Sequence, residues 1–385
     1  MASFWKKHKK IFEAIIFLLL LLLVFIPLGY KMGMENMLNT LMQTSYHLLL
    51  ETCFFLMAIC VLTGALGKLL VEFGVVNMLE KILRPLMKPI FNLPGVAALG
   101  AVLTFLSDNP AIITLAKDRN FSQYFKKYQL VSLTNFGTAF GMGLIVIAFM
   151  VGKGFGMGAG LGLFGAVCGC IVSTRLMQRF TLRAYPEYDS PVLSEQEMEM
   201  LKGDTTKEEN NEQPTFIRAL NGILDGGKTG VEIGLAIIPG VLVISTAVMM
   251  ITFGAAGDKG QYIGAAYEGV RLLPWAAGKI DFVFDWLFGF EFPELVAFPI
   301  TALGAVGAAL GLVPEFIKSG FMDNNAVAVC TAIGMCWSGF LSTHTAMLDS
   351  LGYRHLISKA ILAHTIGGLV AGIVAHFTYL LLSIF

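Results

Sequence analysis

The sequence predicts an all-α polytopic membrane protein with two inverted-topology repeats, each of three spans plus a re-entrant or broken helix pair, preceded by one extra N-terminal span. Of the 385 residues, 56% are hydrophobic and 14% are charged, whereas soluble domains carry about 25% charged residues. Apolar runs long enough to cross a bilayer recur along the chain. In each half an Asp-Asn pair also interrupts shorter apolar arms, which is typical of unwound helices inside membrane proteins.

The predicted elements begin with a span at about 11–30. It follows a lysine-rich start and lacks a small-residue cleavage site, which favours a retained signal-anchor helix. An amphipathic stretch at 72–88, broken by two prolines, predicts an interfacial helix. Apolar runs predict six further spans, at 46–70, 128–152, 157–180, 231–253, 336–351 and 357–383.

Two other apolar stretches are too short to cross, because a span needs roughly 20 residues. The first, at 93–106, ends at Asp108-Asn109-Pro110, and a second short arm follows. The other, at 295–313, precedes Asp323-Asn324-Asn325, after which 326–333 forms a second arm. Each set therefore predicts a re-entrant hairpin or an unwound helix.

The same order of features recurs in both halves: a span containing a glutamate, an interfacial stretch, a short arm with the pentapeptide Ala-Leu-Gly-Ala-Val, an Asp-Asn break and two spans. We divide the chain into an N-terminal transmembrane helix and loop (1–45), a first repeat (46–183), an acidic cytoplasmic linker (184–215) and a second repeat (216–385). The linker is rich in Asp and Glu and poor in apolar residues, which predicts a solvated connection.

The Lys and Arg residues set the predicted orientation. With a cytoplasmic N-terminus, the basic segments at 81–88, 117–127, 175–183 and 354–359 all fall inside, as the positive-inside rule requires. The C-terminus then lies outside, and the second half is inverted relative to the first.

The Asp-Asn motifs are the candidate substrate- or ion-binding site. A carboxylate at membrane depth is costly, so Asp108 and Asp323 require a proton, a cation or a partner. We take them as the ionisable centre, with Asn109, Asn324 and Asn325 as neutral ligands. H+ and Na+ are the two candidate coupling ions, and no other cofactor is expected. Two helix starts converging at the midplane would also present amides to an anion.

The alternative is that these motifs only cap helices, since Asn and Asp are good N-caps and proline suits the first helical position. Asn135 and Ser338 follow the two breaks at similar distances and are further candidate ligands. Glu51 and Glu232 lie near the starts of equivalent predicted spans, where they could instead be interfacial carboxylates.

Four further residues were weighed as a proton relay or metal set: His344, Asp349, His364 and His376. They lack His-Glu-x-x-His spacing, so we predict no metal site and no catalytic residue. The six cysteines lie in apolar segments without metal-finger spacing and are interpreted as packing residues.

The two Asp-Asn breaks, the proline-led short arms and the duplicated halves resemble the Gate, or nucleoside-recognition, domain family. That family includes spore maturation proteins A and B and the dipicolinate transporter of sporulating bacteria. Concentrative nucleoside transporters and the membrane part of ferrous iron transporter B are similar at greater distance. The resemblance covers about 45–180 and 215–385 and implies a transport or gating role, in a bacterial plasma (inner) membrane. The glycine-rich stretch 152–165 lacks the Gly-Lys-Ser/Thr of a P-loop, which disfavours nucleotide-driven iron transport.

The sequence therefore predicts a secondary transporter for a small polar or anionic solute, such as a nucleoside, nucleobase or carboxylate, coupled to H+ or Na+. The alternative is a non-transporting Gate-type partner protein, acting in a homo-oligomer or with a second Gate protein. An intramembrane enzyme or lipid flippase is a third reading, but no nucleophile–base pair supports an enzyme. The expected partners are the solute and the lipid bilayer. The zero net charge gives no indication of nucleic-acid binding.

Overall fold

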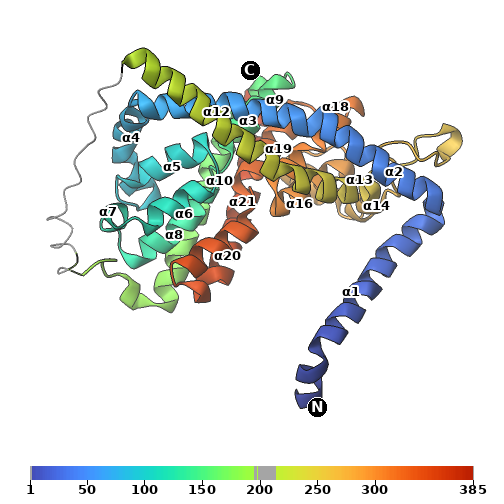
Figure 1. The fold of residues 1–385 in the computed structure, drawn as a ribbon, viewed down its shortest axis with the longest axis horizontal. Coiled ribbons are helices and arrows are strands. Elements are labelled where there is room, and N and C mark those ends of the chain that lie inside the picture. Colours follow the sequence, from blue (N-terminus) through green and yellow to red (C-terminus); the bar gives the residue numbers. More distant parts are fainter. Residues whose placement is uncertain (1, 195–196, 198–213, 385) are drawn as a thin grey trace.

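The computed structural model describes residues 2–194, 197 and 214–384, and all regular secondary structure in these ranges is helical (Figure 1). The predicted all-α class is confirmed. Within the described residues, seven helices are long and apolar enough to cross a membrane, and each overlaps one of the seven predicted spans. They are Lys9–Met32, Met34–Glu72, Lys127–Gly152, Gly156–Ala184, Thr215–Thr252, Asn324–Ser350 and Arg354–Leu382. The chain is an integral membrane protein.

Two of these helices are far longer than a bilayer requires. The first joins α2 (Met34–His47), η1 (Leu48–Cys53) and α3 (Phe54–Glu72), and the second joins α12 (Thr215–Gly240), η4 (Val241–Ser245) and α13 (Thr246–Thr252). A π-helical turn interrupts each one. They lie side by side along the top of Figure 1.

Both helices begin well before the predicted spans, so Glu51 and Glu232 lie in mid-helix rather than near a start. The additional turns carry polar residues, some of which bond distant parts of the protein. Thr40 of α2, for example, donates to the buried carboxylate of Glu268 at 3.3 Å. Hydropathy alone therefore placed the starts of these spans too late.

Glycines bring α3 and α12 together backbone to backbone. Four buried glycines recur at every fourth position of α12, from Gly222 to Gly234. A Cβ atom added to Gly230 would lie 2.3 Å from the Cys60 carbonyl oxygen, and one added to Gly226 would lie 2.4 Å from that of Gly64. Small residues allow such close helix packing in membranes. The residue pairs run in opposite directions, so the two helices are antiparallel.

The helices α10 (Gly156–Ala184) and α21 (Ile357–Leu382) pack in the same way. Added Cβ atoms on Gly165 and Gly169 would lie 2.5 and 2.4 Å from the carbonyl oxygens of Ala371 and Gly367. This pair is also antiparallel. Each pair joins one helix of the first half to the helix in the same place in the second half, which is the packing an inverted repeat produces. The repeat itself stays a prediction.

The core holds two broken spans. One consists of α8 (Lys127–Thr138) and α9 (Gly143–Gly152), and the other of α19 (Asn324–Cys336) and α20 (Phe340–Ser350). Of the residues in their apolar windows, 89% and 83% are buried. The paired helices α3, α12, α10 and α21 pack outside them. This arrangement places the breaks at 139–142 and 337–339 deep within the protein.

The first short arm forms a helical hairpin, with α5 (Ala97–Leu106) and α6 (Pro110–Lys117) on either side of Asp108, as predicted. In the second half the break lies elsewhere. It falls at Ala305, between α16 (Ala297–Gly304) and α17 (Val306–Leu310). The predicted break at 323–325 is wrong, because Asp323 begins α19, the first part of a broken span. Ala305 lies in an apolar, glycine-rich run that gives no polar signal in the sequence.

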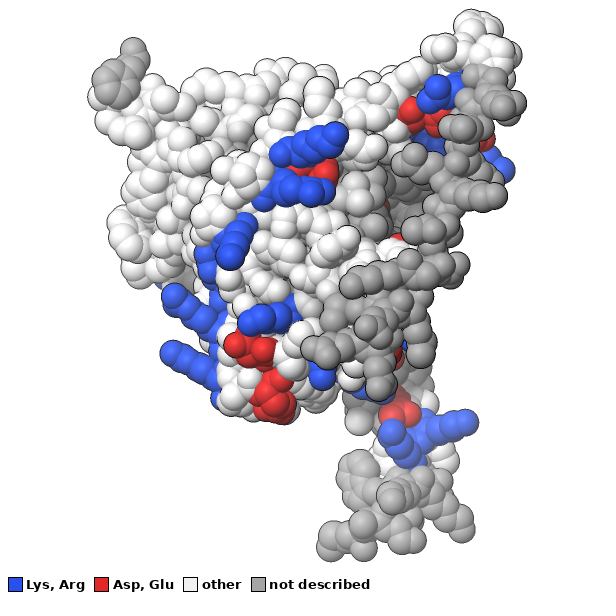
Figure 2. All heavy atoms as spheres, turned by 90° about the vertical axis from the view of Figure 1, so that its left-hand side faces the viewer, with Lys and Arg blue, Asp and Glu red and all other residues white. Residues whose placement is uncertain are grey.

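The remaining helices are short or peripheral. α1 (Ala2–Met32) projects away from the body in Figure 1. α4 (Val75–Leu86) confirms the predicted amphipathic helix. Figure 2, which views the side carrying α4 and α7, shows more Lys and Arg than Asp and Glu. The others are η2 (Met87–Phe91), α7 (Arg119–Ser122), η3 (Pro186–Tyr188), η5 (Asp258–Gly260), α14 (Leu272–Ala277), α15 (Asp281–Phe288), η6 (Pro293–Val296), α18 (Val313–Lys318) and η7 (Arg354–Leu356).

The start of the acidic linker is bound to the loop before α8. The Lys127 amide donates to the Ser190 carbonyl at 3.0 Å, and the Val192 amide donates to that of Phe125 at 3.0 Å. The Lys126 ammonium lies 2.8 Å from the Asp189 carboxylate. The rest of the predicted linker, 195–196 and 198–213, lies outside the described residues.

Cleavage of the linker at a protease site introduced within 198–213 is expected to leave both halves associated and active. The antiparallel pairs α3–α12 and α10–α21 join the halves independently of the linker. Co-purification of the two fragments and their solute flux, compared with the uncut protein, measure this. Intact association with lost flux would instead assign the linker a regulatory role.

Candidate functional site

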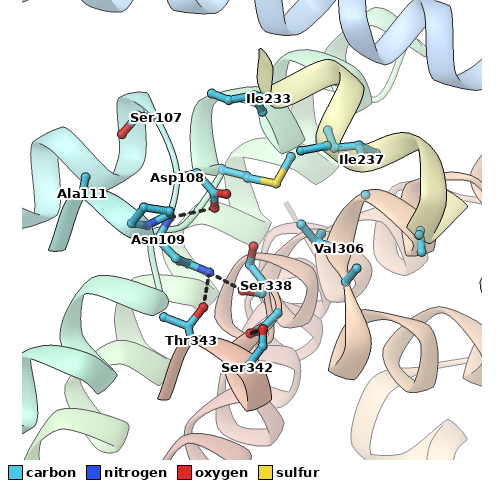
Figure 3. A pocket seen from close by; sticks show the side chains of 18 of the residues that line it. Ser107, Asp108, Asn109, Ala111, Ile233, Ile237, Val306, Ser338, Ser342 and Thr343 are labelled. Atoms are coloured by element: carbon cyan, nitrogen blue, oxygen red, sulfur yellow. Dashed lines mark hydrogen bonds between the residues drawn. The ribbon is translucent and has the colours of Figure 1, made fainter. Parts of the chain in front are cut away.

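A cavity of about 650 Å³ lies where helix breaks from both halves meet (Figure 3). Its volume is within the range of about 300–1,000 Å³ typical of small-molecule sites. One wall is the side of α12. The others are the break between α5 and α6, the break between α16 and α17, and the break between α19 and α20. The lining residues are Ser107, Asp108, Asn109, Pro110, Ala111, Met142, Thr229, Glu232, Ile233, Ala236, Ile237, Gly240, Gly304, Ala305, Val306, Gly307, Ala308, Ser338, Gly339, Ser342 and Thr343.

Asn109 connects the two halves at this cavity. Its side-chain amide donates to the Ser338 carbonyl and, at 3.2 Å, to the Thr343 hydroxyl (Figure 3). The side chain does not cap α6, so the capping interpretation does not hold for Asn109, although Pro110 occupies the first helical turn as expected. A Cβ atom on Gly141, in the α8–α9 break, would lie 1.9 Å from the Asn109 side-chain oxygen. A residue larger than glycine would therefore displace Asn109.

Asp108 lines the cavity beside Asn109. One carboxylate oxygen accepts the Asn109 backbone N–H at 2.7 Å. The next amides of α6 are also engaged, because Ala111 donates to the Asp108 carbonyl at 3.0 Å and Ile112 to that of Asn109 at 3.2 Å. Pro110 has no N–H to offer. The start of α6 therefore does not present the amides to an anion that we expected.

The second Asp-Asn motif lies outside the cavity lining. The Asp323 carboxylate caps α19 by accepting the Ala326 N–H at 2.7 Å. The Asn324 side-chain oxygen accepts the Gly158 N–H at 3.2 Å, and the Asn325 amide donates to the Phe288 carbonyl at 2.9 Å. All three side chains thus bond helix ends. The two motifs do not converge on one site, and the capping interpretation holds for Asp323.

Of the other four candidate ligands, two line the cavity and two lie elsewhere. Ser338 and Glu232 line the cavity. Asn135 is buried and donates to the Ser173 hydroxyl and the Ala360 carbonyl, both at 2.9 Å. The Glu51 carboxylate is exposed and lies 3.0 Å from the His47 ring. That any of these residues binds a solute or an ion stays a prediction.

Sequence reasoning missed four polar lining residues, Ser107, Thr229, Ser342 and Thr343. Gly339, a left-handed glycine between Ser338 and the start of α20, is the sequence signal that could have located the second break. A polar residue directly after such a break is well placed to line a cavity.

The four residues weighed as a relay are not one cluster. His344 and His364 are fully buried, and their ring centroids lie 4.6 Å apart. His376 instead contacts the Asn325 side chain at 2.9 Å, and Asp349 lies 3.7 Å from Arg354. Among residues 2–194, 197 and 214–384, no group of three or more His, Cys, Asp or Glu side chains could hold a metal ion.

Residues 9–154 match the family model described as Gate, nucleoside recognition. The match begins earlier than the predicted resemblance, since it includes most of α1, and it ends before α10. A curated relative, an uncharacterized protein of Alkalihalophilus pseudofirmus, is 34% identical over 89 residues, which are 23% of this chain and 19% of the relative. The match thus spans about a fifth of that relative's length.

Solved structures of the protein CNTnw share the fold of this chain. An inward-facing, substrate-bound structure has a TM-score of 0.51 and 14% identity, over 86% of this chain and 79% of the other. An outward-facing variant also has a TM-score of 0.51 and 14% identity, over 96% and 85%. Identity this low shows the fold alone.

Proposed function

We propose that this protein is a secondary transporter whose small polar solute binds in the cavity between the two halves. The main support is the meeting of helix breaks from both halves around one cavity, bridged by Asn109. Irregular backbone at membrane depth is tolerated where it lines a cavity or is covered by protein. Broken helices near the membrane midplane form the solute sites of many secondary transporters.

The antiparallel pairs α3–α12 and α10–α21 support an inverted repeat, an architecture on which many secondary transporters build alternating access. Because Asn109 and Ser338 come from different halves, their hydrogen bond belongs to one arrangement of the halves. We place the protein in a bacterial inner membrane with a cytoplasmic N-terminus and an outward C-terminus. Coupling to H+ or Na+ at Asp108 completes the proposal.

Purified protein in liposomes is expected to catalyse uptake of at least one labelled solute from a panel of nucleosides, nucleobases, carboxylates, polyols and amines. Asn109→Ala removes two hydrogen bonds between the halves, each worth about 1 kcal/mol, so uptake should fall at least about tenfold. Asn120→Ala, at an exposed position beyond α6, is the control and should keep full uptake.

Flux that depends on pH without sodium would assign H+ as the coupling ion, and flux that depends on sodium at fixed pH would assign Na+. If no solute in the panel binds or is transported, the protein acts as a partner of another membrane protein and the transport proposal is wrong.

A further inference from the structure

We propose that the transported solute is a small aliphatic amine bound in its protonated, cationic form. This inference rests on the proposed transport function and names the solute class of the same cavity. It follows from what the lining groups offer to a ligand: negative charge, hydrogen-bond acceptors and an apolar wall.

The two ionisable side chains of the described lining are both acidic. Asp108 of the first hairpin break and Glu232 of α12 contribute carboxylates, whereas no Lys or Arg is present among the described residues that line the cavity. Charges in a low-dielectric site interact more strongly than in water. A carboxylate solute would be repelled here, and an ammonium group would be attracted.

Three of the five lining hydroxyl groups, those of Ser107, Thr229 and Ser342, act as acceptors because their protons are already committed. Ser107 donates to the Leu103 carbonyl at 2.6 Å, and Thr229 donates to that of Asp225 at 3.1 Å. Ser342 donates to the Gly339 carbonyl at 2.9 Å. A hydroxyl group has one proton and two lone pairs. Each of these oxygens can therefore still accept a hydrogen bond from a solute.

The amide donors near the first break are committed as well. The two side-chain protons of Asn109 go to Ser338 and Thr343, and its backbone N–H goes to the Asp108 carboxylate. A solute at this break therefore meets oxygen acceptors. An ammonium group has three N–H donors and no acceptor, which complements this arrangement.

The remaining wall is apolar and aliphatic. Ile233 and Ile237 of α12 face Val306 across the cavity in Figure 3, and Met142 also lines it. Among its described lining residues, no Phe, Tyr, Trp or His provides a flat ring. Stacking on aromatic rings is a common means of binding nucleobases and quaternary ammonium groups. An aliphatic primary amine, which requires methylene contacts and acceptors, fits the lining better.

Four probes of equal chain length test this inference: 1,5-diaminopentane, 5-amino-1-pentanol, 1,5-pentanediol and glutarate, with uridine as a nucleoside arm. Their binding to the purified full-length protein is measured by thermal shift, and their uptake is measured in liposomes. The two amines should bind and be transported, and glutarate should do neither. Glu232→Gln, which keeps the shape of the side chain, should weaken amine binding at least about tenfold. Asp225→Asn, at an exposed position two turns earlier on α12, should not change it.

Transport of glutarate or uridine without transport of the amines would overturn the inference and leave the proposed transport function standing. Amine binding that is equally tight in Glu232→Gln and in the unaltered protein would also overturn it. If no probe is bound or transported, and a broad solute panel gives no flux either, the proposed function falls with it.

Discussion

Asp108→Asn is expected to abolish transport, with a loss on the order of a hundredfold, while the protein stays folded. Asparagine retains a side-chain oxygen that can accept the Asn109 N–H, so the hairpin break keeps its hydrogen bond. The substitution removes one of the two carboxylates of the cavity lining, and loss of one member of a buried charge interaction costs about 2–5 kcal/mol. Uptake in liposomes and thermal unfolding of the same preparation measure the two effects separately.

Asp323 provides the contrast, because it lies outside the cavity lining and caps α19. Asp323→Ala is expected to reduce stability by about 1 kcal/mol, the usual cost of losing an N-cap, with transport retained at low temperature. Asp323→Asn restores a capping oxygen and should behave as the unaltered protein. Normal transport by Asp108→Asn, or complete loss of transport in Asp323→Asn, would contradict the assignment of Asp108 alone to the site.

Gly230→Ala is expected to destabilise the protein by about 1–3 kcal/mol or more, the range found when a packed interior is overfilled. The new methyl group would lie 2.3 Å from the Cys60 carbonyl oxygen and 2.5 Å from the Val61 Cα. Both are backbone atoms, so α3 and α12 must separate along their whole contact. A lower melting temperature in detergent and weaker association of linker-cleaved halves measure the effect.

Gly227→Ala is the matched control, three residues earlier on the same helix. The nearest atom to its new methyl group is the Val61 Cγ1 at 3.6 Å, an ordinary contact. Because glycine is about 1 kcal/mol less favourable than alanine inside a helix, this variant should be as stable as the unaltered protein or more stable. Equal stability of both variants would show that the two helices are not in backbone contact at Gly230.

The seven spans could be predicted from the sequence because each contains an apolar run long enough to cross a bilayer. The starts of α2 and α12 could not. Their first turns contain polar residues, so they resemble connecting segments, although some of these residues bond distant parts of the chain. Asn36, for example, donates to the Tyr262 carbonyl at 2.9 Å, a contact across 226 positions of the chain.

The Asp-Asn motif was sufficient to identify Asp108 and Asn109 as cavity residues but misleading for Asp323. Both aspartates stand near a helix start, and local sequence does not distinguish a cap from a cavity ligand. Whether such a motif caps a helix or lines a cavity depends on which residues lie opposite it in the folded protein. Gly141 leaves room for Asn109 to reach the other half, whereas the Asp323 carboxylate reaches only the Ala326 amide of its own helix.

Composition and apolar run length alone determined that this chain is a helical membrane protein, because a helix satisfies its backbone hydrogen bonds within one segment. The position of the cavity was decided only by tertiary structure. Ala305 and Glu232 line that cavity with Asp108, although they lie more than a hundred residues further along the chain. The donor and acceptor balance of the cavity depends on which protons neighbouring carbonyls already accept, and those contacts form only when the two halves pack together.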